Sequence, residues 1–169
     1  MKSTSIQTIH SDAVSTLSYD ASVPCSHIVW HGFASSQDFR AACLRAYELM
    51  RQHRLSKGIS DARNLRIISL TDQQWFTDEY LPMVFGLQIS STYYSAVIVP
   101  KDYFGRQSLD AIAEMAQSVI TQKYEGLQAT TRYFDNEDDA RQWLMSLPDS
   151  EQIQPTRSGA TDADAIQAA

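Results

Sequence analysis

Apolar and polar positions alternate along the first part of the chain in a way that predicts strands. In residues 25–33, Ile28 and Trp30 fall on one side of an extended backbone while the residues between them fall on the other. Looser alternation over 5–10 and 14–19 predicts two edge strands. The chain should therefore open as an antiparallel meander.

A helical period follows. Apolar residues recur every three or four positions through 36–55, which is typical of an amphipathic helix. Either Ser35 or Ser36 can cap its first turn. Residues 57–61 are then predicted to form a short strand.

A second helix is predicted to begin at Thr71, because Thr71 and Gln74 have the spacing of a capping box. Pro82 should kink or shorten this helix, since proline has no backbone N–H to donate. Gly86 should end it.

The second half of the chain repeats strand and helix. Residues 93–100 are almost continuously aromatic or β-branched, which suits a central strand buried on both faces. A helix is predicted over 107–123 and a strand over 129–134. Asp135 should cap a short final helix with an acidic first turn.

Strands and helices thus alternate from about residue 25, which favours parallel strands joined by right-handed crossovers. With the antiparallel entry, this predicts an α/β fold, a mixed β-sheet flanked by about four helices, in a single domain over residues 1–147. Residues 148–169 contain no aromatic residue and few apolar ones. We expect them to form a disordered tail.

Composition restricts the partners. The 169-residue chain has a net charge of −6, which disfavours nucleic acid and anionic lipid, since both favour a basic surface. No stretch is apolar enough for a signal peptide or a membrane span, so we expect a cytoplasmic protein that is not transmembrane. Cys25 and Cys43 do not form a CxxC pair, and we expect both to be buried as small hydrophobes.

The sequence offers little material for catalysis or for a metal. His27 and His31 would lie about 13 Å apart on a strand, too far to share an ion. The chain has no GxSxG nucleophile motif and no GxGxxG or GxxxxGK phosphate-binding motif. We therefore expect no metal, no cofactor and no enzymatic activity.

A polar cluster follows the strand predicted over 57–61. Asp61, Arg63 and Asn64 stand where the strand ends, the usual ligand position in open α/β sheets. The same spacing also suits an ion pair between Asp61 and Arg63 with Asn64 in a turn, and this is the interpretation we favour.

Three aromatic residues have two interpretations. Tyr103 and Phe104 fall in the predicted loop after the central strand, and Trp75 falls on the helix interrupted by Pro82. Together they could wall an apolar pocket or a partner-docking patch. Filling of the core is the alternative, and we favour it.

Several short motifs, taken in order, resemble the SpoIIAA-like group of the STAS/SEC14 superfamily. They are Tyr19-Asp20, Trp30 to Phe33, Ser60 to Ser69, Asp72 to Trp75, Leu81-Pro82, Val97 to Gly105, and Tyr133 to Leu144. The likeness spans roughly residues 14–147. It implies a mixed sheet flanked by helices, in a protein that binds other proteins, small ligands or lipids and is not an enzyme.

The resemblance also implies candidate phosphorylation sites. STAS regulators have a strand that ends in Asp and a phosphorylated Ser where the next helix begins. Asp61 matches that Asp, and the spacing places the candidate site at Ser69 or Thr71. The family's Asp-Ser-Ser-Gly pattern is absent here. We therefore favour Thr71 as a plain N-cap, worth about 1 kcal/mol.

These observations predict a non-enzymatic regulatory or protein-interaction module. Its partner or ligand face would comprise Asp61, Arg63, Asn64, Thr71, Trp75, Tyr103 and Phe104. The alternative is a small-ligand or lipid-binding module of the SEC14 type, with an apolar pocket between sheet and helix. The oligomeric state stays open.

Overall fold

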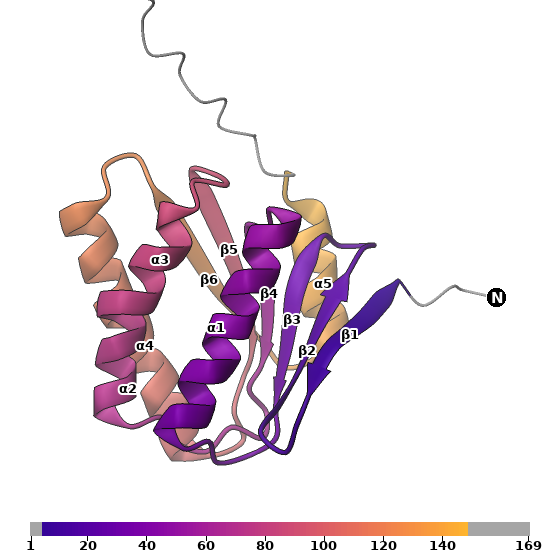
Figure 1. The fold of residues 1–169 in the computed structure, drawn as a ribbon, viewed down its shortest axis with the longest axis vertical. Coiled ribbons are helices and arrows are strands. Elements are labelled where there is room, and N and C mark those ends of the chain that lie inside the picture. The colour runs from indigo at the N-terminus through magenta and orange to yellow at the C-terminus, as the bar shows by residue number, and fades with distance from the viewer. Residues whose placement is uncertain (1–4, 149–169) are drawn as a thin grey trace, which may run out of the picture.

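The fold is that of a computed structural model, which describes residues 5–148. The chain forms three layers, a central β-sheet with helices on both of its faces (Figure 1). The tail predicted for residues 148–169 lies outside the described residues except for Pro148.

The sheet has six strands whose order in space follows their order in the chain. β1, β2 and β3 pair antiparallel, whereas β3, β4, β5 and β6 pair parallel. The predicted mixed sheet is therefore confirmed, although β2 is an interior strand and only β1 of the first two is an edge. The strands are β1 (Ile6–Ser11), β2 (Ser15–Asp20), β3 (Cys25–Trp30), β4 (Lys57–Asp61), β5 (Thr92–Ile98) and β6 (Gln128–Phe134).

Each parallel connection carries a helix, because parallel neighbours need a crossover. One face is covered by α1 (Ser36–His53), by a continuous run of three helical segments, and by α4 (Tyr103–Lys123). The opposite face is covered by α5 (Glu137–Ser146). The continuous run consists of α2 (Leu70–Trp75), the π-helical turn η1 (Phe76–Tyr80) and α3 (Leu81–Gly86).

Two predicted helix caps are wrong, and in each case a neighbouring side chain caps the helix. Ser69, not Thr71, caps α2, because the Ser69 hydroxyl accepts a hydrogen bond from the Asp72 amide. Asn136, not Asp135, caps α5. Both are short polar side chains in extended backbone, as N-caps require.

Helix α4 begins earlier than predicted. Asp102 caps it by accepting a hydrogen bond from the Gly105 amide, so the helix begins at Tyr103 and not at residue 107. Tyr103 and Phe104 therefore lie in the first turn of a helix, not in a loop.

The irregularity predicted at Pro82 is present as a wide turn. In η1 the Leu81 amide donates to the Phe76 carbonyl, five residues back. π-Helical turns and prolines are both common causes of helix bends, and here the π-helical turn η1 lies next to Pro82. The helix then ends at Gly86, as predicted.

The main core lies between the sheet and the helices α1, α2–α3 and α4. A smaller core under α5 includes Cys25, Ile59 and Leu144. Both cysteines are buried, as predicted. Burial raises the pKa of the Cys25 thiol to about 12 and also raises the pKa of Cys43, so both side chains remain uncharged at neutral pH.

Gly105 determines how closely α4 approaches the loop before α2. A Cβ atom at this position would lie 2.5 Å from the carbonyl oxygens of both Leu65 and Arg66. Backbone oxygens cannot move aside as a flexible side chain can. This part of the α4 interface therefore requires glycine.

We expect Gly105→Ala to lower the free energy of unfolding by about 1–3 kcal/mol, because the added methyl group overpacks a backbone contact. Gly86→Ala is the matched control, since its Cβ meets nothing within 4 Å. It should leave stability unchanged or raise it by less than about 1 kcal/mol. Urea unfolding of both variants measures the difference, and equal stabilities would contradict the packing argument.

Candidate functional site

An internal cavity of about 260 Å³ lies between the sheet and the helices on its α1 side. Its lining is mainly apolar. The helical wall includes Phe39, Cys43 and Ala46 of α1, Phe76, Tyr80 and Val84 of η1 and α3, and Ile112, Ala113 and Ala116 of α4.

The floor of the cavity is a row of small residues that crosses the parallel strands. The pairing register aligns Ser26 with Gly58, Gly58 with Ser95, and Ser95 with Thr131. All four residues line the cavity. Because none of them has a large side chain, the space above this level of the sheet stays unfilled.

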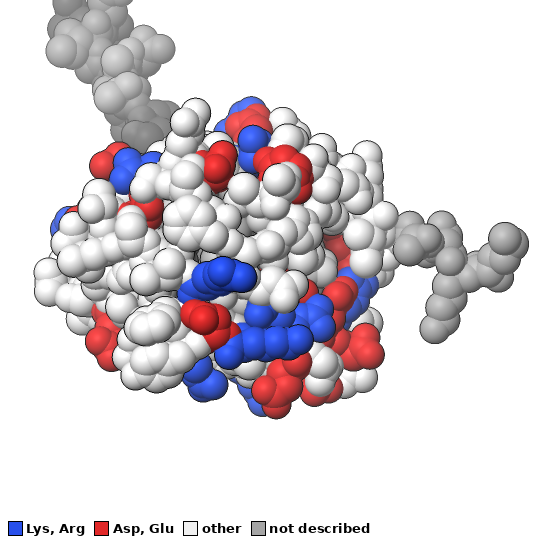
Figure 2. All heavy atoms as spheres, turned by 90° about the horizontal axis from the view of Figure 1, so that it is seen from below, with Lys and Arg blue, Asp and Glu red and all other residues white. Residues whose placement is uncertain are grey.

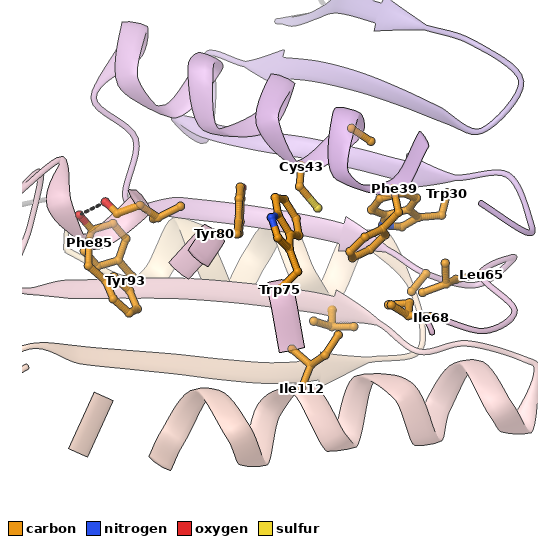
Figure 3. Close-up of a cluster of buried hydrophobic side chains, with 14 of the residues drawn as sticks. Trp30, Phe39, Cys43, Leu65, Ile68, Trp75, Tyr80, Phe85, Tyr93 and Ile112 are labelled. Atoms are coloured by element: carbon orange, nitrogen blue, oxygen red, sulfur yellow. Dashed lines mark hydrogen bonds between the residues drawn. The ribbon is translucent and has the colours of Figure 1, made fainter. Parts of the chain in front are cut away.

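Aromatic side chains stand around this space. Figure 3 shows Phe39, Trp75 and Tyr80 over the strands between helices α1 and α4, with Ile112 beside α4. Phe39, Tyr80 and Ile112 line the cavity, and Trp75 packs behind them. The rings are in contact, with centroid separations of 6.4 Å for Phe39 and Trp75 and 5.9 Å for Trp75 and Tyr80. Rigid rings that brace one another cannot collapse into the gap, which helps to keep it open.

Some polar groups beside the cavity are hydrogen-bonded within the chain, and others are not. The Trp30 indole N–H donates to the Ser60 hydroxyl at 3.2 Å, and the Tyr93 hydroxyl donates to the Val84 carbonyl at 3.3 Å. By contrast, within residues 5–148 the hydroxyls of Ser26 and Tyr80 make no hydrogen bond, although these residues are only 8% and 7% exposed.

Part of the lining of the cavity belongs to the edge strand β6. Thr131 and Tyr133 line the cavity and are also exposed to solvent. The lining of the cavity therefore extends to exposed residues at this edge of the sheet.

None of the seven residues predicted to form the ligand face lines this cavity. Trp75 is buried in the core, as the favoured interpretation predicted. The others lie at or near the carboxyl ends of the strands, and Figure 2 views the molecule from that end.

Asp61 and Arg63 form the ion pair that we favoured. The Arg63 guanidinium donates two hydrogen bonds to the Asp61 carboxylate, of 2.9 and 2.6 Å. Burial opposes ionisation of Asp61, but these bonds outweigh it and hold the pKa of Asp61 below its ordinary value. The carboxylate is thus already bonded to its own chain, and the neighbouring Asn64 is exposed.

Asp72 ties the start of α1 to the start of α2. Its buried carboxylate accepts hydrogen bonds from the hydroxyls of Ser36 (2.6 Å) and Ser69 (2.7 Å), and from Arg40 Nε (2.8 Å). Burial opposes ionisation here too, but these donors hold the pKa of Asp72 below its ordinary value. The hydroxyl of Ser69, a candidate phosphorylation site, is therefore already hydrogen-bonded to Asp72, whereas Thr71, the other candidate, is exposed.

Large apolar side chains are exposed at this same end of the molecule. Leu70 is 65% exposed and Tyr103 is 68% exposed, and Phe33 and Phe104 are exposed as well. Tyr103 and Phe104 contact each other, with ring centroids 5.6 Å apart. In Figure 2, Lys and Arg side chains cross the middle of this face with uncharged surface beside them.

A second group of buried charges lies on the opposite face, under α5. The Asp20 carboxylate pairs with Arg141, and His27 Nδ1 lies 3.9 Å from a Glu137 carboxylate oxygen. Burial lowers the pKa of His27, and the nearby carboxylates of Glu137 and Asp61 only partly oppose this effect. His27 is therefore neutral in the folded protein at neutral pH.

Within residues 5–148, no group of three His, Cys, Asp or Glu side chains is placed to hold a metal ion. Likewise, no helix in that range has the length and apolar character needed to cross a membrane.

Comparisons with family models, with curated proteins and with solved structures found no match. The likeness to the SpoIIAA-like group therefore stays a prediction.

The residues that create the cavity were not predicted from the sequence. Ser26, Gly58 and Ser95 are small residues inside three separate strands, and each by itself only weakens its strand pattern. They gain meaning when the register aligns them. A search for small residues at equivalent positions of predicted parallel strands could have found them.

We expect the stability of the protein to fall as pH is lowered from about 7.5 to about 5, because of His27. Its pKa is lower in the folded than in the unfolded chain, so the unfolded state binds more protons in this range and is favoured. The pKa values of Asp20, Asp61 and Asp72 are also lowered by folding, but those groups act only near and below about pH 4. Urea unfolding should show a shallower pH dependence for His27→Gln, and parallel curves would contradict this assignment.

Proposed function

We propose that this protein binds a small apolar molecule in the cavity between its sheet and helices. The observation that supports the proposal is the cavity itself, about 260 Å³ of mainly apolar space. This is the ligand-binding alternative of the sequence prediction, which placed an apolar pocket between sheet and helix, although the seven residues predicted for the ligand face do not line the cavity.

The volume limits the size of the ligand. A dry apolar cavity of about 150 Å³ accepts benzene, and pockets for larger ligands measure about 300–1,000 Å³. The cavity falls between these sizes. It therefore suits a molecule of one or two rings, or a short branched chain, and is too small for a two-chain lipid.

The driving force would be the removal of apolar surface from water, worth about 25 cal/mol per Å². A rigid ligand suits the rigid aromatic wall, since little conformational freedom is then lost on binding.

We expect naphthalene to bind the purified protein and to raise its melting temperature. Ala116→Phe should weaken this binding at least about tenfold, or 1.4 kcal/mol, because the new ring occupies the cavity that Ala116 lines. Isothermal titration calorimetry measures the affinity.

The control is Ala111→Phe, the same change on the same helix at a residue that does not line the cavity. It should retain the wild-type affinity. Absence of naphthalene binding to the wild-type protein, or equal binding to both variants, would count against the proposal.

A second candidate function is docking of a protein partner at the carboxyl end of the sheet. It is favoured by the exposed apolar side chains of Phe33, Leu70, Tyr103 and Phe104, since contiguous apolar surface often marks an interaction site. These residues come from three connections that the fold brings to one end.

We expect Leu70→Asp to abolish capture of any partner that the wild-type protein retains from a lysate, since a charge would be buried in the interface. Met145→Asp is the control, because Met145 is equally exposed on α5, away from this end. Quantitative affinity capture tests this. Retention of the same proteins by both variants would exclude Leu70 from the interface.

A further inference from the structure

The cavity combines an apolar wall with hydroxyl groups that have no partner. Tyr80 extends from the wall formed by η1, and Ser26 lies in the floor formed by β3. Ser95 continues the floor on β5, and in the described part of the chain its hydroxyl is likewise without a hydrogen bond.

Other polar groups among the lining residues are already bonded within the chain. The Tyr93 hydroxyl bonds the chain at Val84 and Ile89, and the Trp30 indole bonds Ser60. A polar group that lines a cavity and makes no hydrogen bond within the chain can bond a ligand placed there. The unpaired hydroxyls are thus the lining groups that a bound molecule could bond without breaking a hydrogen bond of the chain.

The cavity has no group that could neutralise a charged ligand. Among its lining residues within 5–148, the only charged one is Lys57. Lys57 alternates with Gly58 along β4, and its amino group donates to the Leu147 carbonyl, beyond the end of α5 on the other face of the sheet. A carboxylate in the cavity would lose its hydration with no cation beside it.

We propose that the cavity takes a neutral amphipathic molecule, such as a phenol, an alcohol or a ketone, whose oxygen bonds the free hydroxyls of Ser26 and Tyr80. This inference rests on the proposed function, since it names the chemistry of the ligand for the same cavity. A hydroxyl can both donate and accept, so either a carbonyl or a hydroxyl oxygen suits it. Fatty acids and other carboxylates are excluded as ligands.

Three probes with the same ring system separate these claims: naphthalene, 2-naphthol and 2-naphthoate. We expect 2-naphthol to bind the wild-type protein about fivefold more tightly than naphthalene, the effect of one buried hydrogen bond. The carboxylate should bind at least about a hundredfold more weakly than 2-naphthol at neutral pH. Isothermal titration calorimetry gives the three affinities.

Two variants identify the groups responsible. Tyr80→Phe and Ser26→Ala should each reduce the ratio of 2-naphthol affinity to naphthalene affinity, and the double variant should bring it close to one. Tyr47→Phe, which alters a tyrosine that does not line the cavity, is the control for removal of a phenol. Thermal unfolding checks that each variant is folded. If one of the two variants does not fold, Ser95→Ala takes its place in the same comparison of 2-naphthol and naphthalene affinities.

The outcomes distinguish this inference from the proposed function. If naphthalene binds but 2-naphthol binds no better, or 2-naphthoate binds equally well, the inference is overturned and the apolar site stands. A 2-naphthol preference that survives in the double variant also overturns it. If none of the three probes binds the wild-type protein, both the inference and the proposed function are wrong.

Discussion

The parallel register of β3, β4, β5 and β6 determines which side chains meet on each face of the sheet. On the α1 side it aligns Ser26, Gly58, Ser95 and Thr131 in one row. A register shift of one residue on any of these strands would turn its small residue to the opposite face. The cavity therefore depends on backbone pairing as much as on the residues that line it.

The helices complete the cavity because they are held apart at defined distances. Gly105 lets the start of α4 touch the loop before α2, and the buried Asp72 carboxylate joins the starts of α1 and α2. Both contacts lie at the carboxyl end of the sheet. Towards the other end of the helices, the row of small residues and the small side chains of Ala113 and Ala116 leave space open.

The two faces of the sheet carry different chemistry. Around the cavity on the α1 side the polar groups are mainly neutral hydroxyls among aromatic rings, whereas under α5 they are charged and paired, as in Asp20 with Arg141. Strand alternation produces this separation, since Gly58 and Ser60 face one layer while Lys57 and Ile59 face the other. The charged face contributes to pH-dependent stability, and the neutral face is suited to an uncharged ligand.

Local pattern in the sequence determined the elements of this protein, because strand alternation, helical period and stop residues such as Gly86 act over a few neighbouring positions. It also determined the ion pair between Asp61 and Arg63, two residues apart. Only tertiary structure decided that Ser69 and not Thr71 caps α2, since the Asp72 carboxylate at that cap is also bound by α1 residues more than thirty positions away. The cavity is likewise a tertiary feature, because its volume arises where small residues on separate strands align beneath helices that cannot approach further.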